Sequence, residues 1–139
     1  DTFPDLREHI KDVEDICREE RIAFTLLGRR RQLFNAANER DKGAKARALR
    51  QAFNQTIQGF AAEINKQAML NCASDRDLRE LDCHLLVTVH DELLFECPER
   101  SADEAIPIIQ HNMERCFKDL LKVDLHASVG RGRSWGDAK

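Results

Sequence analysis

Apolar residues recur at helical spacing in the first part and in the middle of the chain. The first run predicts an amphipathic helix over 1–21, with Pro4 tolerated in its first turn. Its apolar positions are Leu6, Ile10, Val13 and Cys17. The second run predicts a long helix over 44–72, in which Gly59 indicates a break or a close backbone approach near 56–59. The apolar face of this helix consists of Phe53, Ile57, Phe60, Ala61, Ile64 and Ala68.

A third helical pattern covers 101–121. Ser101 and Glu104 have the spacing of a capping box at its start. Pro107 either bends the first turn of this helix or marks its true beginning. The buried face is expected to contain Ile106, Ile109, Met113, Cys116, Phe117 and Leu120.

Extended segments separate the helical ones. Residues 22–34 hold two short runs around Gly28, which can supply the backbone conformation of a tight reversal, so they predict a β-turn-β unit. Two apolar, β-branched and aromatic runs predict a second hairpin over 84–97, preceded by a polar linker over 73–82. A last strand is expected over 123–129. This order of elements is typical of an α+β fold with an antiparallel sheet, and we expect a single partial domain over 1–139.

Charge is unevenly distributed along the chain. The net charge of −3 does not by itself indicate nucleic-acid binding. Residues 29–50 hold eight basic side chains against two acidic ones, a local charge of +6, whereas 75–104 hold ten acidic side chains against three arginines. Such asymmetry is expected when one surface meets phosphates and another carries metal-binding or solvated acids. The alternative is that both charged segments are ordinary solvent-exposed faces without a ligand.

Cysteine spacing and hydropathy narrow the class of protein. The five cysteines are odd in number and show no Cys-x-x-Cys spacing, so they indicate neither a zinc site nor a disulfide framework. Reduced thiols in an intracellular protein fit this pattern. No apolar stretch approaches the roughly 18 residues of a membrane span, and no signal peptide is recognisable. Because the chain begins Asp-Thr-Phe-Pro without an initiator Met, we expect it to be part of a longer protein.

A polar stripe runs along the predicted helix over 44–72. Arg47, Arg50, Asn54 and Gln58 are separated by three, four and four residues, which aligns them on one side of a continuous helix. Amides can donate to the acceptors that every base pair presents in the minor groove. Arg50 would hold a phosphate, which adds affinity without sequence specificity. An ordinary polar helix face is the alternative.

The predicted hairpin over 84–97 places two adjacent carboxylates, Asp91 and Glu92, between apolar strands. A cation is one way to keep buried carboxylates ionised, because an unpaired buried charge is costly. A solvated turn explains the same residues without a cation. His90 is either a structural hydrogen-bonder or part of the site.

Three ordered segments resemble the family A, polymerase I-like, DNA polymerases. Val-His-Asp-Glu at 89–92 resembles the family's motif C. Thr-Leu-Leu-Gly-Arg-Arg-Arg at 25–31 resembles the hairpin that follows the fingers, and 50–62 matches the family's Arg-x3-Asn-x3-Gln-Gly-x-Ala-Ala segment. The Gly-Arg-Ser-Trp-Gly run at 132–136, together with Asp-Glu-Leu-Leu at 91–94, is most similar to the eukaryotic theta and nu branch.

The resemblance implies the C-terminal palm region of a template-dependent DNA polymerase that adds dNTPs to a primer 3′-hydroxyl. Two metal ions, Mg²⁺, serve this reaction. By similarity to motif C, Asp91 is expected to bind metal, Glu92 to support it and His90 to lie at the primer end. The expected contacts to template-primer DNA are Arg29, Arg30, Arg47, Arg50, Asn54 and Gln58.

Other parts of the family pattern are missing from this chain. The family's second metal-binding Asp lies in an Asp-Tyr-Ser-type motif, and its nucleotide-gripping helix carries Lys, Arg and Tyr; neither is present, and the chain has no Tyr. We therefore expect the isolated chain to be inactive without upstream polymerase segments. The chain also departs from the family at Thr56, Phe60 and Glu63, where Pro, Ser or Thr, and Asp are usual, which affects the helix break and the fine primer contacts.

Alternative functions follow from the same residues. One is a non-catalytic DNA-binding or docking module whose acids are only structural. Another is an unrelated metal-dependent hydrolase, although no second carboxylate or His cluster occurs at ligand spacing. Within the polymerases, theta-like similarity implies a nuclear repair enzyme of end joining and damage bypass, and a replicative or repair polymerase I-type protein is the alternative.

Overall fold

The computed structural model describes residues 3–138. They form two compact units, which divide in the sequence between Ala62 and Glu63. Each unit combines helices with one two-stranded antiparallel sheet, which confirms the predicted mixed α+β class. No helix in the described part of the chain is both long and apolar enough to cross a bilayer.

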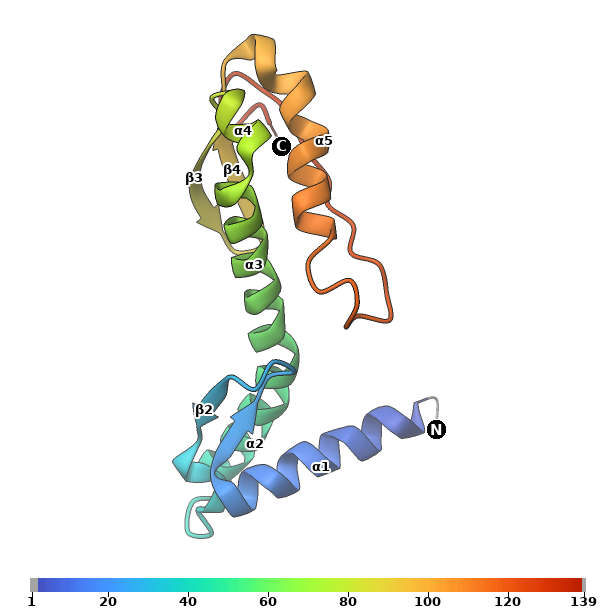
Figure 1. Cartoon of the computed structure of the whole chain (residues 1–139). Coiled ribbons are helices and arrows are strands. Elements are labelled where there is room, and N and C mark those ends of the chain that lie inside the picture. The colour runs from blue at the N-terminus through green and yellow to red at the C-terminus, as the bar shows by residue number, and fades with distance from the viewer. Residues whose placement is uncertain (1–2, 139) are drawn as a thin grey trace. The chain divides into compact units, whose positions relative to one another are not determined.

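The first unit consists of a helix, a short hairpin and the beginning of a long helical segment (Figure 1). Its elements are α1 (Pro4–Glu20), β1 (Ile22–Phe24), β2 (Arg30–Gln32), the 3₁₀ helix η1 (Phe34–Ala37), α2 (Lys42–Asn54) and the π-helix η2 (Gln55–Gly59). Its core contains Cys17, Ala23, Leu33, Ala36, Ala48, Leu49 and Ala52. The strands are shorter than the predicted 22–34 unit, because the chain turns into η1 directly after Leu33.

The β1–β2 turn is closed by backbone and side-chain hydrogen bonds. Gly28 adopts φ +83°, the left-handed conformation predicted for this position. The Gly28 N–H donates to the Thr25 carbonyl at 3.0 Å, and the Thr25 N–H donates to the Arg29 carbonyl at 3.0 Å. Strand pairing then continues from Phe24 opposite Arg30.

Gly28→Ala is expected to destabilise the first unit by about 1 kcal/mol, because an L-residue is disfavoured in left-handed backbone. A Cβ at this position meets no atom within 4 Å, so no steric clash adds to that cost. Urea unfolding of the chain, followed by circular dichroism, measures the difference. Gly28→Asn is the control with a smaller loss, since Asn tolerates this conformation better. Equal losses for Ala and Asn would contradict the backbone explanation.

The helix predicted over 44–72 is built from α2, η2 and α3 (Phe60–Ser74), which follow one another without interruption. The π turn occupies the predicted break at 56–59, and the Thr56 hydroxyl donates to the Phe53 carbonyl at 2.8 Å. The expected single apolar face is wrong at Ile57 and Ala61, which are both exposed. A π turn inserts an extra residue into the helical repeat, so a stripe at α-helical spacing does not continue through it.

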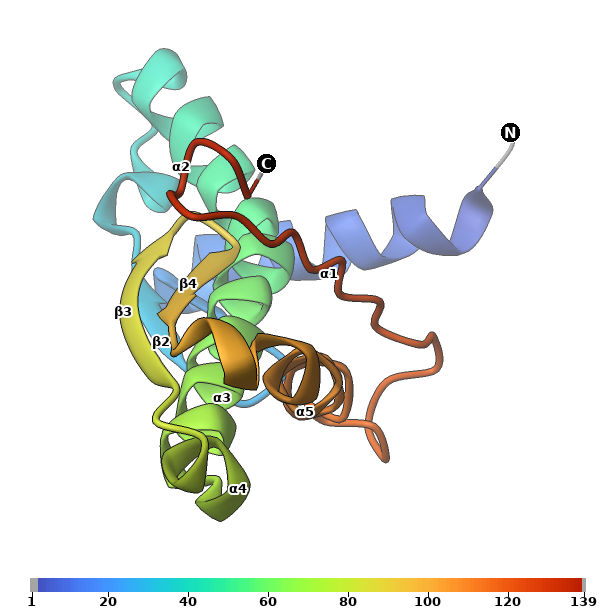
Figure 2. The same cartoon turned by 90° about the horizontal axis from the view of Figure 1, so that it is seen from above.

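The second unit gathers helices around the longer hairpin (Figure 2). Its elements are most of α3, α4 (Arg76–Glu80), β3 (His84–Val89), β4 (Glu92–Glu96), the 3₁₀ helix η3 (Glu99–Ser101) and α5 (Ala102–Glu114). Its buried core contains Cys72, Leu78, Cys83, Ala105 and Ile109. Burial raises the pKa of the Cys72 and Cys83 thiols to about 11, so both stay protonated at neutral pH.

The linker predicted over 73–82 contains the short helix α4. Asp75 begins this helix, since its carboxylate accepts from the backbone N–H groups of Asp77 and Leu78 at 3.0 and 3.1 Å. Leu78 is 1% exposed and fills the core of the unit. A single turn that presents one apolar side chain gives no helical periodicity, which is why this segment resembles a linker in sequence.

The helix predicted over 101–121 ends at Glu114 and continues as turns over 115–120. Phe117 has φ +52°, a left-handed conformation that an α-helix cannot contain. The predicted capping box is also wrong, because Ser101 has a helical backbone as part of η3 and makes no side-chain cap bond.

The strand predicted over 123–129 does not form in the described chain. Side chains of α5 satisfy the backbone in the middle of this segment. Gln110 donates to the Ala127 carbonyl at 2.9 Å, and the Glu114 carboxylate accepts from the Ala127 N–H at 3.0 Å. These bonds replace the strand ladder that the alternating sequence suggests.

Candidate functional site

The predicted polar stripe lies on the exposed side of α2 and η2 in the first unit. Arg47, Arg50, Asn54 and Gln58 are all exposed, whereas Ala48, Leu49 and Ala52 on the other side of the helix are buried. Asn54 and Gln58 are four residues apart, which is nearly one π-helical turn, so both amides remain on similar sides. The stripe therefore offers two guanidinium groups and two amides to a ligand.

A pocket of about 350 Å³ lies between the β1–β2 hairpin and the π turn, within the first unit. It is lined by the side or main chains of Arg29, Arg30, Arg31, Gln55, Gln58 and Gly59, among others, and no carboxylate lines it. In residues 3–138, none of these arginines forms an ion pair with an acidic side chain. The pocket is consequently a site of uncompensated positive charge.

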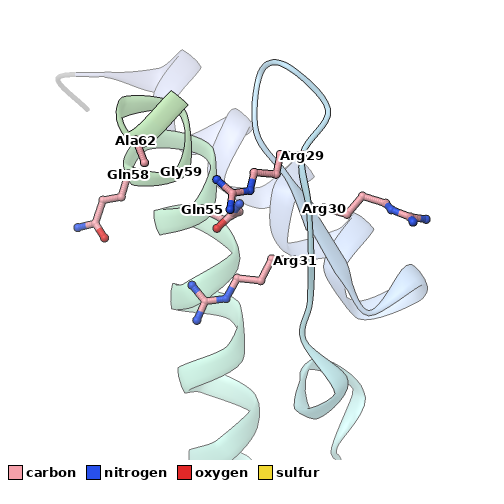
Figure 3. A pocket seen from close by; sticks show the side chains of 7 residues that line it. All are labelled: Arg29, Arg30, Arg31, Gln55, Gln58, Gly59 and Ala62. Atoms are coloured by element: carbon pink, nitrogen blue, oxygen red, sulfur yellow. The ribbon is translucent and has the colours of Figure 1, made fainter. Parts of the chain in front are cut away.

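Figure 3 shows how the polar side chains lie around this pocket. Arg29 and Arg31 extend from the hairpin toward the helix and Gln55, while the guanidinium of Arg30 points the opposite way. The amide of Gln58 also extends away from the arginines. Arg31 and Gln55 thus belong to the polar residues around the pocket, and neither was among the expected DNA contacts. The expected DNA contacts of Arg29 and Arg30 stay predictions.

The acidic hairpin of the second unit has a two-residue turn. Val89 pairs with Glu92, so His90 and Asp91 alone form the turn and Glu92 belongs to β4. All three polar residues are exposed. The burial argument for a bound cation is therefore wrong, because both carboxylates can be hydrated without one.

Asn65 of α3 holds the tip of this hairpin. Its Nδ2 donates to the Thr88 hydroxyl and to the His90 carbonyl, each at 3.1 Å. Sequence reasoning did not identify Asn65, since a polar helix residue carries no signal for a partner 25 positions away.

The carboxylate at the hairpin tip fits part of a metal site. Oxygen ligands such as those of Asp91 and Glu92 suit Mg²⁺. In the described part of the chain, no group of three or more His, Cys, Asp or Glu side chains is arranged to hold a metal ion. The described residues therefore supply at most part of the ligand set of such an ion.

Comparison with known proteins decides the family. The sequence model of DNA polymerase family A matches residues 1–137. This chain belongs to DNA polymerase family A. The resemblance predicted from three short motifs is confirmed, and it extends over nearly all residues of the chain.

Individual family A polymerases are similar over the same length. DNA polymerase theta of Caenorhabditis elegans is 38% identical over 138 residues, which are 99% of this chain and 8% of that protein. The thermostable DNA polymerase I of Thermus filiformis is also 38% identical over 138 residues, 99% of this chain and 16% of that protein.

A solved family A structure shares the fold. The POL domain of Pol1 from M. smegmatis, in complex with DNA primer-template and dNTP, matches with a TM-score of 0.85 and 38% identity. The match covers 95% of this chain and 23% of that chain. This chain therefore spans less than a quarter of the length of these family A polymerases.

Proposed function

We propose that this chain is the part of a template-dependent DNA polymerase that grips the primer-template duplex and contributes one carboxylate to the metal site. The observation that carries this proposal is the family match over residues 1–137. It is supported by the similarity to a POL domain whose structure contains DNA primer-template and dNTP. A non-catalytic docking module has no observation of its own in its favour.

The exposed stripe supplies the proposed contacts to duplex DNA. Arg47 and Arg50 bind backbone phosphates, which adds affinity without sequence information. Asn54 and Gln58 donate to minor-groove acceptors, which are present in every correctly paired base pair. Arg29 adds a phosphate contact from the β1–β2 turn. This chemistry checks pairing and does not read sequence.

The acidic hairpin supplies the proposed catalytic contribution. Asp91 would hold Mg²⁺, with Glu92 in support and His90 at the primer end. In a two-metal site the ions activate the primer 3′-hydroxyl and stabilise the leaving pyrophosphate. Two observations support this role: Asp91 is exposed in the turn, and Asn65 holds the carbonyl of the preceding residue, His90.

Primer extension tests the proposal. The full-length protein is expected to add dNTPs to a primed template in the presence of Mg²⁺. The isolated 139-residue chain is expected to add none, because the described residues contain no complete metal-ligand cluster. Adding the upstream polypeptide in trans should restore extension. A full-length protein that binds DNA and never extends a primer would support the docking module instead.

We propose further that the full-length protein is a nuclear repair polymerase of the theta or nu type. The runs at 91–94 and 132–136 support this assignment, whereas the 38% identities to a theta enzyme and to a polymerase I enzyme do not separate the two. The full-length reading frame tests it. A helicase-like region upstream favours theta, and a bare polymerase favours nu or a polymerase I-type protein.

A further inference from the structure

The β1–β2 hairpin rests directly on the backbone of the π turn. A Cβ added to Gly59 would lie 2.7 Å from Cγ2 of Thr25 and 2.8 Å from Nε2 of Gln55. The Gln55 amide is the end of a flexible side chain and can move aside. Thr25 is 6% exposed, and turning its side chain to move Cγ2 aside would break the bond from the Arg29 N–H to its Oγ1. Only glycine at position 59 permits this approach.

The same threonine fixes the start of the arginine run. Its Oγ1 accepts from the Arg29 N–H at 3.1 Å, in addition to the backbone bond from the Thr25 N–H to the Arg29 carbonyl at 3.0 Å. Successive side chains of an extended strand alternate in direction, so Arg29 and Arg31 share a face and Arg30 takes the other. Figure 3 shows this alternation.

The π turn provides the facing group. Gln55 is the first residue of η2 and lines the pocket opposite the arginines (Figure 3). Two guanidinium groups and one side-chain amide can donate hydrogen bonds to the oxygens of a phosphate group. A guanidinium group binds phosphate with two parallel hydrogen bonds. The lining contains no carboxylate that would repel an anion.

We propose that Arg29, Arg31 and Gln55 hold one phosphate group of a DNA strand, and that Thr25 and Gly59 are positioning residues for this pocket. The inference rests on the proposed DNA binding and deepens it. It joins Arg31 and Gln55 to the proposed phosphate contact of Arg29, on the hairpin side of the π turn. Free pyrophosphate or a nucleotide triphosphate has the same chemistry, and the test separates these sources.

Equilibrium binding of a labelled primer-template duplex to the full-length protein, without divalent metal or nucleotide, tests the pocket over a series of salt concentrations. Arg29→Ala and Arg31→Ala are each expected to weaken binding several-fold and to reduce the slope of log K against log salt by about 0.9, the loss of one phosphate contact. Arg40→Ala removes the same charge from an exposed position of the same unit outside the pocket. It is expected to leave that slope unchanged.

The close approach of Thr25 to Gly59 has its own test. Gly59→Ala is expected to weaken duplex binding several-fold and to lower the salt slope by about 0.9, because the added methyl group displaces the arginines from the pocket. The double variant Thr25→Ser with Gly59→Ala is expected to restore the salt slope and part of the affinity, since serine keeps the hydroxyl that binds Arg29 and lacks Cγ2. The Gln55 amide stays displaced by the new methyl group. Circular dichroism verifies that each variant is folded.

Several results would overturn the proposal. Arg40→Ala could match the losses of Arg29→Ala and Arg31→Ala, which would show that the effect comes from net positive charge and not from the pocket. The double variant could fail to recover binding while folded, which would show that the contact between Thr25 and Gly59 does not position the pocket. Calorimetry with pyrophosphate could show binding that Arg31→Ala abolishes while duplex affinity is untouched, which would assign the pocket to a free anion. None of these binding measurements depends on nucleotide addition, so their results can be interpreted even if the polymerase proposal fails.

Discussion

Asp91→Ala in the full-length protein is expected to lower the rate of nucleotide addition by about a thousandfold or more, while duplex affinity changes less than about twofold. Loss of a metal ligand removes several kcal/mol of transition-state stabilisation, and about 4 kcal/mol corresponds to a thousandfold in rate. The hairpin should survive the change, because Asp91 is an exposed turn residue and pairing resumes at Val89 and Glu92. Single-turnover primer extension and duplex binding measure the two quantities.

Matched carboxylates on the same hairpin provide the controls. Glu92→Gln is expected to cause a smaller loss, since Glu92 belongs to β4 and only supports the site. Glu96 is also exposed and lies at the other end of β4, opposite His84 in the strand register. Glu96→Gln therefore removes a similar charge away from the turn and should leave extension unchanged. Asp91→Ala retaining a rate within tenfold of the parent protein would refute the metal-ligand role.

Asn112→Asp is expected to destabilise the second unit by about 4 kcal/mol at pH 7. Asn112 is 1% exposed, and its Nδ2 donates to the Asp75 carboxylate at 2.7 Å. An aspartate there would place two carboxyl groups in direct contact, and two such neighbours cannot both ionise. Keeping one of them protonated at neutral pH requires raising its pKa from about 3.9 to about 7, a shift of about three units, each worth about 1.4 kcal/mol. Urea unfolding followed by circular dichroism measures the loss.

The pH dependence of this variant has a definite sign. The hydrogen bond from Asn112 lowers the pKa of Asp75 below its ordinary value of 3.8, and the backbone N–H groups of α4 contribute in the same direction. In the parent chain, this stabilisation is present above the unfolded pKa and is lost as the pH falls through the folded pKa. In the variant the carboxyl pair titrates at raised pKa, so its deficit is largest at pH 7 and shrinks toward pH 4.

Asn112→Leu separates charge from the lost hydrogen bond. It removes the donor and adds no carboxyl group, so its loss at pH 7 should be smaller than that of Asn112→Asp. A deficit of Asn112→Asp that is the same at pH 4 and pH 7 would show that packing, and not carboxyl repulsion, causes it.

Periodicity in the sequence predicted the elements whose stability is local. The spacing of apolar residues located α1 and the long helix, and Gly59 located the π turn within it. Elements that depend on partners far away in the sequence were not predicted correctly. The segment 123–129 alternates like a strand, yet α5 side chains satisfy its backbone. The turn of α4 is set by one capping residue, Asp75, and by burial of Leu78, neither of which leaves a repeat in the sequence.

Motif similarity predicted which residue types gather at the site, but not their directions. The arginine run at 29–31 was expected to contribute Arg29 and Arg30 to DNA binding, which stays a prediction. Figure 3 shows that Arg31 also extends toward Gln55 and that the guanidinium of Arg30 points the opposite way. A one-residue shift in strand register reverses such an assignment. Motif C likewise identified the acidic turn, while its exposure and its attachment through Asn65 required the three-dimensional arrangement.

His90 occupies a position that backbone energetics would give to another amino acid. Its φ of +57° lies where glycine or asparagine is most comfortable, and an ordinary L-residue there forgoes about 1 kcal/mol of stability. Protein engineers who raise the thermal tolerance of this polymerase segment by consensus-style loop optimisation would be drawn to replace it. Replacing His90 by glycine or asparagine would make the turn more stable, but it would remove the imidazole that we propose lies at the primer end. Position 90 should therefore be excluded from such libraries.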